Sequence, residues 1–83
     1  MKLYEKVKLY RISNGFKQAF IAKKSGMSEK KLSAIETGRQ RLTTDDFEVI
    51  CRLGFMVNPG IFFESTFLES KNVTVNNNPN PAA

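Results

Sequence analysis

The segment QAFIAKKSGMSEKKLSAIETGR, residues 18–39, constrains the fold more than any other part of the chain. Its apolar residues recur at helical spacing on both sides of a three-residue break, Ser25-Gly26-Met27. Helices this short are marginal alone in water, because the first turn costs more entropy than its one hydrogen bond returns. A shared hydrophobic core must therefore hold the two helices together.

Residues that begin and end helices divide the rest of the chain into helical segments. Ser28 is a suitable N-cap, and Thr43 with Asp46 three residues later resembles a capping box. Gly26 and Gly38 each follow a periodic apolar segment, where glycine commonly ends a helix. We therefore expect an all-α, compact five-helix domain, with helices over about residues 2–13, 18–24, 29–37 and 43–53, and a short fifth helix from residue 60 to about 63 or beyond.

The charge balance points to a polyanionic partner. The chain of 83 residues is long enough for one small domain and carries a formal net charge of +5. Twelve of the basic residues but only six of the acidic ones lie in residues 1–63, so the excess falls on the part expected to fold. This distribution favours nucleic acid over a membrane surface as the partner.

Several classes of site and location are not supported by the composition. The chain has no His and one Cys, which excludes a disulfide framework and the usual zinc sites. Cys51 lies in an apolar helical run, so we expect a buried structural thiol. No apolar run approaches the roughly 20 residues of a membrane span, and the start alternates charged and apolar residues, unlike a signal peptide. We expect a cytoplasmic protein without metal, cofactor or membrane partner.

The helix expected over residues 29–37 has two distinct faces. At 100° per residue, Leu32 and Ile35 point to the same side and belong to the core. The other side is small or polar, and it follows directly after the three-residue break. The side chains collected on this second face are those of Glu29, Lys30, Ser33, Ala34 and Thr37.

These residues resemble a known family. Gln18, Ala22 and Gly26 are followed by Ser28-x-x-x-Leu32-Ser33-x-Ile35-Glu36-x-Gly38. The combination is similar to helix-turn-helix domains of the phage-repressor type, often called xenobiotic-response-element regulators. The similarity covers residues 3–53 well and 54–64 loosely. It implies a lambda-repressor-like fold, with the third helix in the major groove of double-stranded DNA and the second across the backbone.

The resemblance also implies roles for individual side chains. Glu29, Lys30 and Ala34 stand where the family contacts bases: Lys30 can donate to guanine, Glu29 can accept from cytosine, and the Ala34 methyl can touch thymine. Arg11 and Glu36 stand at positions that pair in many relatives and are expected to form a structural ion pair. The residues expected to contact the DNA backbone are Lys17, Gln18, Ser28, Lys31, Ser33, Thr37, Arg39 and Arg41.

Three residues depart from the family pattern. Lys17 replaces the hydroxyl residue common before the Gln, which removes a helix cap and adds a charge beside the DNA backbone. Phe20 replaces a residue that is usually polar, so it either packs beneath the first helix or marks an extra contact surface. Thr37 stands where Asn is frequent.

Aromatic residues crowd the C-terminal third of the chain, in numbers that one small core is not expected to absorb. A contiguous apolar remainder commonly marks a partner surface. We therefore expect a DNA-binding domain with a dimerisation segment over residues 1–69, followed by a disordered polar tail over 70–83. The residues assigned to the dimer interface are Ile61, Phe62, Phe63, Phe67 and Leu68.

The function expected from these features is sequence-specific transcriptional regulation by a homodimer on an inverted repeat. The alternative is an antitoxin whose C-terminal aromatic segment captures a toxin while it autoregulates its operon. Phage repressors, restriction-modification controllers and antitoxins all remain open as subfamilies. An enzyme is the weakest hypothesis, because the chain has no paired catalytic constellation and no Gly-rich phosphate loop, and no small-molecule ligand is evident.

Overall fold

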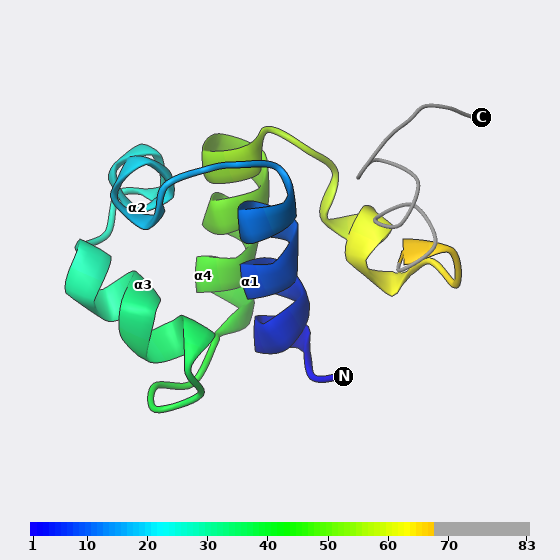
Figure 1. The fold of residues 1–83 in the computed structure, drawn as a ribbon, viewed down its shortest axis with the longest axis horizontal. Helices are drawn as coiled ribbons and strands as arrows, with labels where there is room; N and C mark the ends of the chain where they lie inside the picture. The colour runs from blue at the N-terminus through cyan, green and yellow to red at the C-terminus, as the bar shows by residue number, and fades with distance from the viewer. Residues whose placement is uncertain (68–83) are drawn as a thin grey trace.

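The computed structural model describes residues 1–67, and this part of the chain is helical without strands. Two segments that are not regular α-helices, here called η1 (Ile50–Phe55) and η2 (Pro59–Phe63), complete the fold; Figure 1 labels the four α-helices. η1 is a π-helix that directly continues the fourth α-helix, and η2 is a short 3-10 helix. In chain order the elements are α1 (Leu3–Ser13), α2 (Gln18–Ser25), α3 (Glu29–Glu36), α4 (Thr44–Val49), η1 (Ile50–Phe55) and η2 (Pro59–Phe63).

The prediction of five helices is therefore wrong: the described residues form four α-helices. The fifth predicted helix is the five-residue η2 segment. Its start follows the expected signals, with Pro59 in the first turn and the Asn58 side chain accepting a hydrogen bond from the Gly60 N–H at 2.8 Å. At Glu64 the backbone already turns extended, so the segment ends before an α-helical ladder is established.

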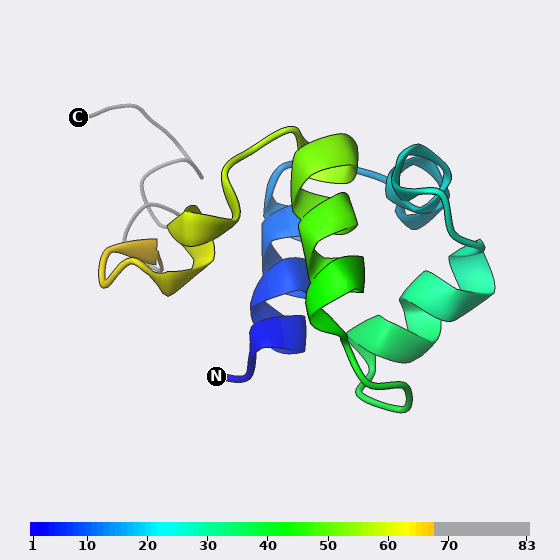
Figure 2. The ribbon, with the colours of Figure 1, turned by 180° about the vertical axis from the view of Figure 1, so that it is seen from behind.

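The helices α1 and α4 lie side by side and run in the same direction, with η1 extending α4 (Figures 1 and 2). The α2–α3 pair lies on one side of α1 and α4, and η2 lies on the other side. The side chain of Lys6 ties η2 to α1, because its Nζ donates to the carbonyl of Phe62 at 2.9 Å. The η2 segment thus covers the side of the core that is remote from α2 and α3, and it does not cover those two helices.

The turn between α2 and α3 depends on a left-handed residue. Gly26 has φ +77°, a conformation that side chains disfavour, and its N–H donates to the Lys23 carbonyl at 3.1 Å. The next helix then begins at Ser28, whose hydroxyl accepts a hydrogen bond from the Lys31 N–H at 3.0 Å. These two local signals set where α2 stops and where α3 starts.

The part of the core that contains η1 and η2 is built mainly from aromatic rings. The ring of Tyr10 lies 4.9 Å from Phe55, 5.3 Å from Phe62 and 6.4 Å from Phe67, measured between centroids. Cys51 is buried, as expected, and this burial raises the pKa of its thiol to about 12. The buried apolar side chains are Val7, Ile21, Ala22, Leu32, Ile35, Phe47, Ile50, Cys51, Phe55, Phe62 and Phe67.

The expected dimer interface needs correction at two positions. Phe62 is fully buried and Phe67 nearly so, because both rings pack on Tyr10 within the same chain. Neither is available at the surface for a second copy. Ile61 is half-buried, and Phe63 is 65% exposed. Leu68 and the predicted tail over 70–83 lie outside the described residues.

We predict opposite outcomes for the adjacent substitutions Phe62→Ala and Phe63→Ala. The first leaves a cavity in the aromatic core and should lower the free energy of unfolding by about 3–5 kcal/mol. The second removes an exposed ring and should cost about 1 kcal/mol or less. Urea unfolding followed by circular dichroism, at low protein concentration, measures both. Equal losses would contradict the assignment of Phe62 to the core.

Candidate nucleic-acid interface

The face of α3 opposite the core is open to solvent. Leu32 and Ile35 are fully buried on the inner side, whereas Glu29 and Lys30 are exposed at the N-terminal end of the outer side. Ser33 and Ala34 continue this outer side and are partly exposed. The helical period of about 3.6 residues therefore separates α3 into a buried inner face and an exposed outer face. The three residues expected to contact bases thus lie on one surface of one helix.

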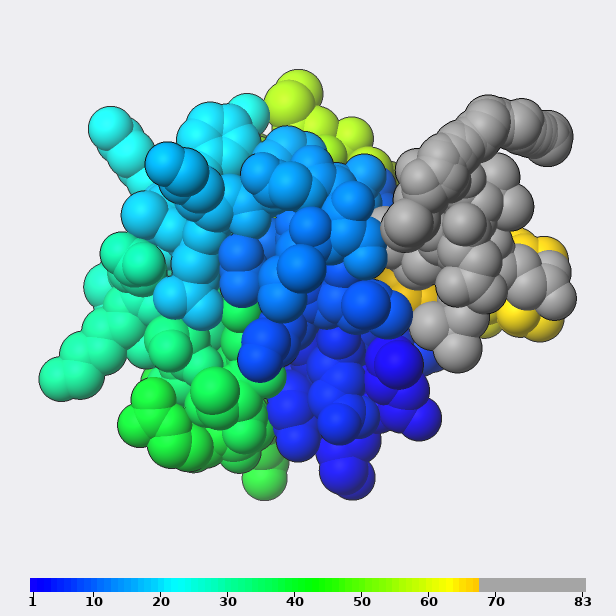
Figure 3. All heavy atoms as spheres, viewed as in Figure 1, coloured from blue at the N-terminus to red at the C-terminus, as the bar shows by residue number. Residues whose placement is uncertain are grey.

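The loop that follows α3 adds two exposed arginines to this surface. Arg39 and Arg41 are both exposed, and the Nε of Arg39 donates to the hydroxyl of Thr37 at 3.2 Å. Thr37 in turn donates its hydroxyl to the Ser33 carbonyl at 3.0 Å, which fixes the start of the loop against α3. Figure 3 shows the segments from α2 through this loop together on one side of the molecule, opposite the side on which η2 lies.

Glycine is favoured at position 38, where the loop leaves α3. Its φ is +81°, and a Cβ at this position would lie 2.7 Å from the hydroxyl of Tyr4 on α1. Both the left-handed backbone conformation and the close approach of Tyr4 disfavour a side chain here. Tyr4 of α1 thus lies against the start of the loop, whereas Arg39 and Arg41 are exposed.

A buried carboxylate joins three helices beneath this surface. Glu36 accepts hydrogen bonds from Arg11 Nε at 2.7 Å and Arg11 Nη2 at 3.0 Å, so the expected pair is present and bidentate. The side chains are 12% exposed for Arg11 and 1% exposed for Glu36. Gln18 Nε2 also donates to Glu36 Oε1, at 3.0 Å, and Arg11 Nη1 donates to the Phe16 carbonyl at 2.8 Å. The network connects α1, α2 and the end of α3.

Two contacts at this surface join residues that are distant in the sequence. Gln18 was assigned only to the DNA backbone, yet one of its amide donors is used by Glu36. Lys31 was assigned to a phosphate, yet its Nζ lies 3.2 Å from the carboxylate of Asp46 on α4. Asp46 carried a capping signal only, and the Thr43 hydroxyl does accept its N–H at 3.0 Å. Contacts over 15 and 18 positions depend on tertiary packing and have no local sequence signal.

The other positions have simpler surroundings. Lys17 is exposed at the start of α2, and Ser28 is exposed but occupied as the cap of α3. Phe20 is about half exposed; its ring lies 6.0 Å from that of Phe16, and Lys24 Nζ lies 5.5 Å from its centroid. Phe20 therefore packs beside the connection between α1 and α2 and keeps one open face.

The comparisons with known proteins agree with this geometry. A family model described as a helix-turn-helix domain matches residues 5–54, which include all four α-helices from Glu5 onward. The chain therefore belongs to the helix-turn-helix domain family, whose fold is that of DNA-binding regulators. Comparisons with curated proteins and with solved structures returned no match. None of the helices in residues 1–67 is long and apolar enough to cross a membrane.

We predict that Glu36→Ala lowers the free energy of unfolding by about 3–5 kcal/mol, because it strands the largely buried guanidinium of Arg11. The double variant Arg11→Ala with Glu36→Ala should lose less than the sum of the two single variants. Thermal melts by circular dichroism, combined with urea titrations, give the values.

Glu48→Ala is the matched control for this measurement. It removes the same type of side chain from an ion pair with Arg52 in which both side chains are 56% exposed. Such a pair contributes about 1 kcal/mol or less. A Glu36→Ala protein as stable as Glu48→Ala would show that the buried network does not hold the helices together.

Proposed function

We propose that this protein is a sequence-specific, double-stranded DNA-binding transcriptional regulator of the phage-repressor type. It acts without a cofactor or catalysis, by occupying a promoter with α3 in the major groove. The observation that carries the proposal is the exposed outer face of α3 in a helix-turn-helix unit, continuous with a loop bearing two exposed arginines. This arrangement combines base-reading groups with backbone-binding cations on one surface.

Individual roles follow from the chemistry of the exposed groups. Lys30 can donate to guanine O6 and N7, and Glu29 can accept from the cytosine amino group. Ala34 offers a methyl for thymine. Arg39 and Arg41 suit phosphates of the neighbouring backbone. Lys17, Gln18, Ser28, Ser33 and Thr37 supply further backbone contacts from the start of α2 and the edges of α3.

We predict that Lys30→Ala and Arg39→Ala affect DNA binding differently. Losing Lys30 should relax preference at one base position per half-site and cost about 1–3 kcal/mol on the preferred sequence. Losing Arg39 should weaken binding to all sequences and reduce the slope of log affinity against log salt concentration by about 1. Selection of preferred duplexes from a random pool, followed by anisotropy titrations with preferred and random DNA, distinguishes the two.

An equal loss on preferred and random DNA in both variants would refute base reading by Lys30. Wild-type protein that selects no preferred sequence, and binds no duplex at low salt, would refute the proposed function itself.

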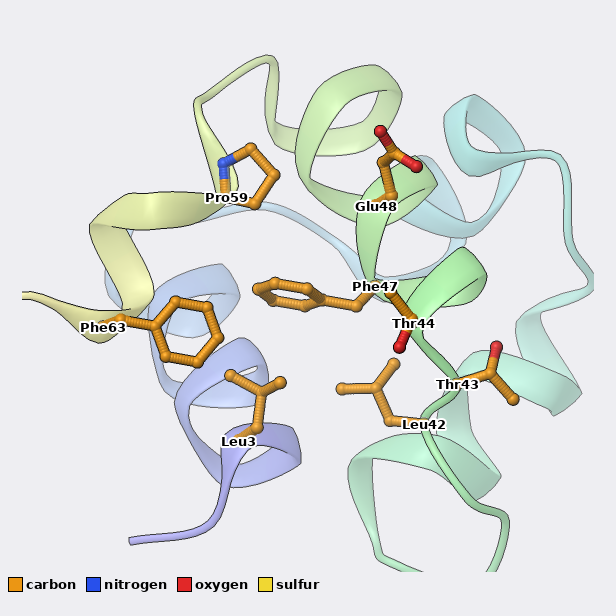
Figure 4. A pocket seen from close by; sticks show the side chains of 8 residues that line it. All are labelled: Leu3, Leu42, Thr43, Thr44, Phe47, Glu48, Pro59 and Phe63. Atoms are coloured by element: carbon orange, nitrogen blue, oxygen red, sulfur yellow. The ribbon is translucent and has the colours of Figure 1, made fainter.

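We further propose that two copies bind an inverted repeat. One helix in the major groove reads only a few base pairs, and a two-fold pair with recognition helices about 34 Å apart reads twice as many. The surface that supports this proposal surrounds Phe63, whose exposed ring meets Phe47 edge-on at 5.8 Å. A hollow of about 400 Å³ opens beside it (Figure 4), lined by Leu3, Leu42, Thr43, Thr44, Phe47, Glu48, Pro59 and Phe63.

This surface suits a symmetric contact. A two-fold interface requires a patch that is complementary to itself, and an exposed aromatic ring beside a largely apolar hollow offers the two parts of such a contact. In Figure 4 the side chains of Leu3, Leu42 and Phe63 surround the hollow from three different segments. Phe63 of one copy can therefore enter the hollow of the other, reciprocally. The interface proposed here keeps Phe63 and the half-buried Ile61 and omits the buried Phe62 and Phe67.

We predict that Phe63→Glu yields a folded monomer with greatly weakened affinity for an inverted-repeat duplex, because burying a charge against the apolar side chains of the hollow is costly. Leu53→Glu is the matched control: it adds the same charge at an exposed apolar position outside the hollow. It should remain dimeric. Analytical ultracentrifugation at tens of micromolar gives the oligomeric state of each protein.

A wild-type monomer at this concentration would refute the homodimer. The exposed Phe63 surface would then be available to a different protein, as the antitoxin alternative requires, and pull-down with the product of an adjacent gene would test that alternative directly.

A further inference from the structure

One cation of the proposed DNA surface is already engaged within the chain. Lys31 Nζ lies 3.2 Å from Asp46 Oδ1, and the side chains are 37% and 18% exposed, respectively. Among residues 1–67 no ion pair is formed by Lys17, Lys30, Arg39 or Arg41, the other basic residues assigned to this surface. Lys31 therefore differs from them in having a carboxylate partner in the free protein.

The position of Asp46 is fixed by its own helix. It lies in the first turn of α4, where its N–H donates to the Thr43 hydroxyl at 3.0 Å. The N-cap bond thus fixes the backbone of Asp46 just after the arginine-bearing loop, and the contact with Lys31 brings its carboxylate against α3. A negative charge at this place lies beside the surface that the proposed function assigns to phosphates.

We propose that Asp46 limits the affinity of this protein for duplex DNA by competing with a backbone phosphate for Lys31. The inference rests on the proposed DNA-binding function. A carboxylate and a phosphate oxygen make the same kind of charge-assisted hydrogen bond with an ammonium group, so one anion can replace the other. When a phosphate takes Lys31, Asp46 is left unpaired next to the polyanion and must recruit a cation from solution.

The size of the effect is set by the exposure of the pair. A partly exposed ion pair is weak, so DNA displaces Asp46 and the change in affinity is severalfold, not orders of magnitude. The salt dependence is more diagnostic, since each phosphate neutralised contributes about 0.9 to the slope of log affinity against log salt. When Asp46 takes up a cation, this uptake offsets part of the counterion release and makes the slope shallower. Removing the charge of Asp46 should restore the full slope.

The experiment compares Asp46→Asn with Asp45→Asn. Both substitutions remove one negative charge from the first turn of α4 and change the net charge equally. The Asp45 side chain is exposed and makes no hydrogen bond or ion pair within residues 1–67, so it controls for general electrostatics. Binding to a short duplex of random sequence is measured by fluorescence anisotropy over a salt titration.

We expect Asp46→Asn to bind severalfold more tightly than Asp45→Asn at about 50 mM salt. This advantage should shrink about threefold by 200 mM, the change that one additional phosphate contact produces over that range. In a Lys31→Gln background the two Asn variants should bind alike. Asp46→Ser, which keeps the backbone N–H to Thr43, repeats the measurement should the Asn variant fail to fold in a circular dichroism melt.

Equal affinities and slopes for Asp46→Asn and Asp45→Asn would overturn the inference while leaving DNA binding intact. An advantage that persists without Lys31 would overturn it as well, because Asp46 would then act only as a general repulsive charge. Absence of duplex binding by the wild-type protein would instead refute the proposed function, and with it this inference.

Discussion

The buried carboxylate of Glu36 is the interaction on which the arrangement of the helix-turn-helix unit depends. A charge taken out of water is costly unless its partners stand in the right places. For Glu36 these partners are Arg11 from α1 and Gln18 from α2, with three hydrogen bonds of 2.7 to 3.0 Å. The network is satisfied only when the three helices have one relative orientation. Apolar packing alone is less selective, since it tolerates shifts that keep the same area buried.

The Glu36 network sets the orientation of the helices, and the aromatic core adds the apolar contacts that stabilise them. The helices α2 and α3 have eight residues each, which is too short to persist in isolation. The buried residues of α2 and α3 pack in one core with those of α4 and η1. Phe55 of η1 in turn packs against Tyr10 and Phe62. The segment after the helix-turn-helix unit is thus part of the monomer's core. Folding of the proposed DNA-binding surface and burial of Phe62 are therefore coupled.

Local signals in the sequence were sufficient for most of the fold. The Ser28 and Thr43 caps, the left-handed Gly26 and the inward pair Leu32 and Ile35 are each determined by a few neighbouring residues, and all lie as predicted. The outer face of α3 follows from the same helical period. Such features need no knowledge of the tertiary structure.

The predictions that were wrong concern features that depend on tertiary packing and not on neighbouring residues in the sequence. The predicted fifth helix became a 3-10 segment because the chain turns extended at Glu64. Phe62 and Phe67 were assigned to a surface because composition alone does not show how many rings a core accepts around Tyr10. The Lys31–Asp46 pair joins two helices across a loop, and the resemblance to a family supplied only the role of Lys31 toward DNA. The roles toward DNA themselves stay predictions.

The distribution of acidic groups links the stability of the fold to its proposed function. A DNA-binding surface must be basic, yet short helices also need carboxylates, at N-termini and in interhelical pairs. Here Glu36 is 1% exposed and fully paired beneath the surface, so it stabilises the fold while its charge is compensated locally. Asp46 is more exposed and stands at the edge, where a capping position and the α3 surface meet. In the proposed function, a carboxylate placed there would favour the helix at the expense of attraction to DNA. On this proposal, the depth of each carboxylate below the surface would determine whether it acts on folding alone or also on DNA binding.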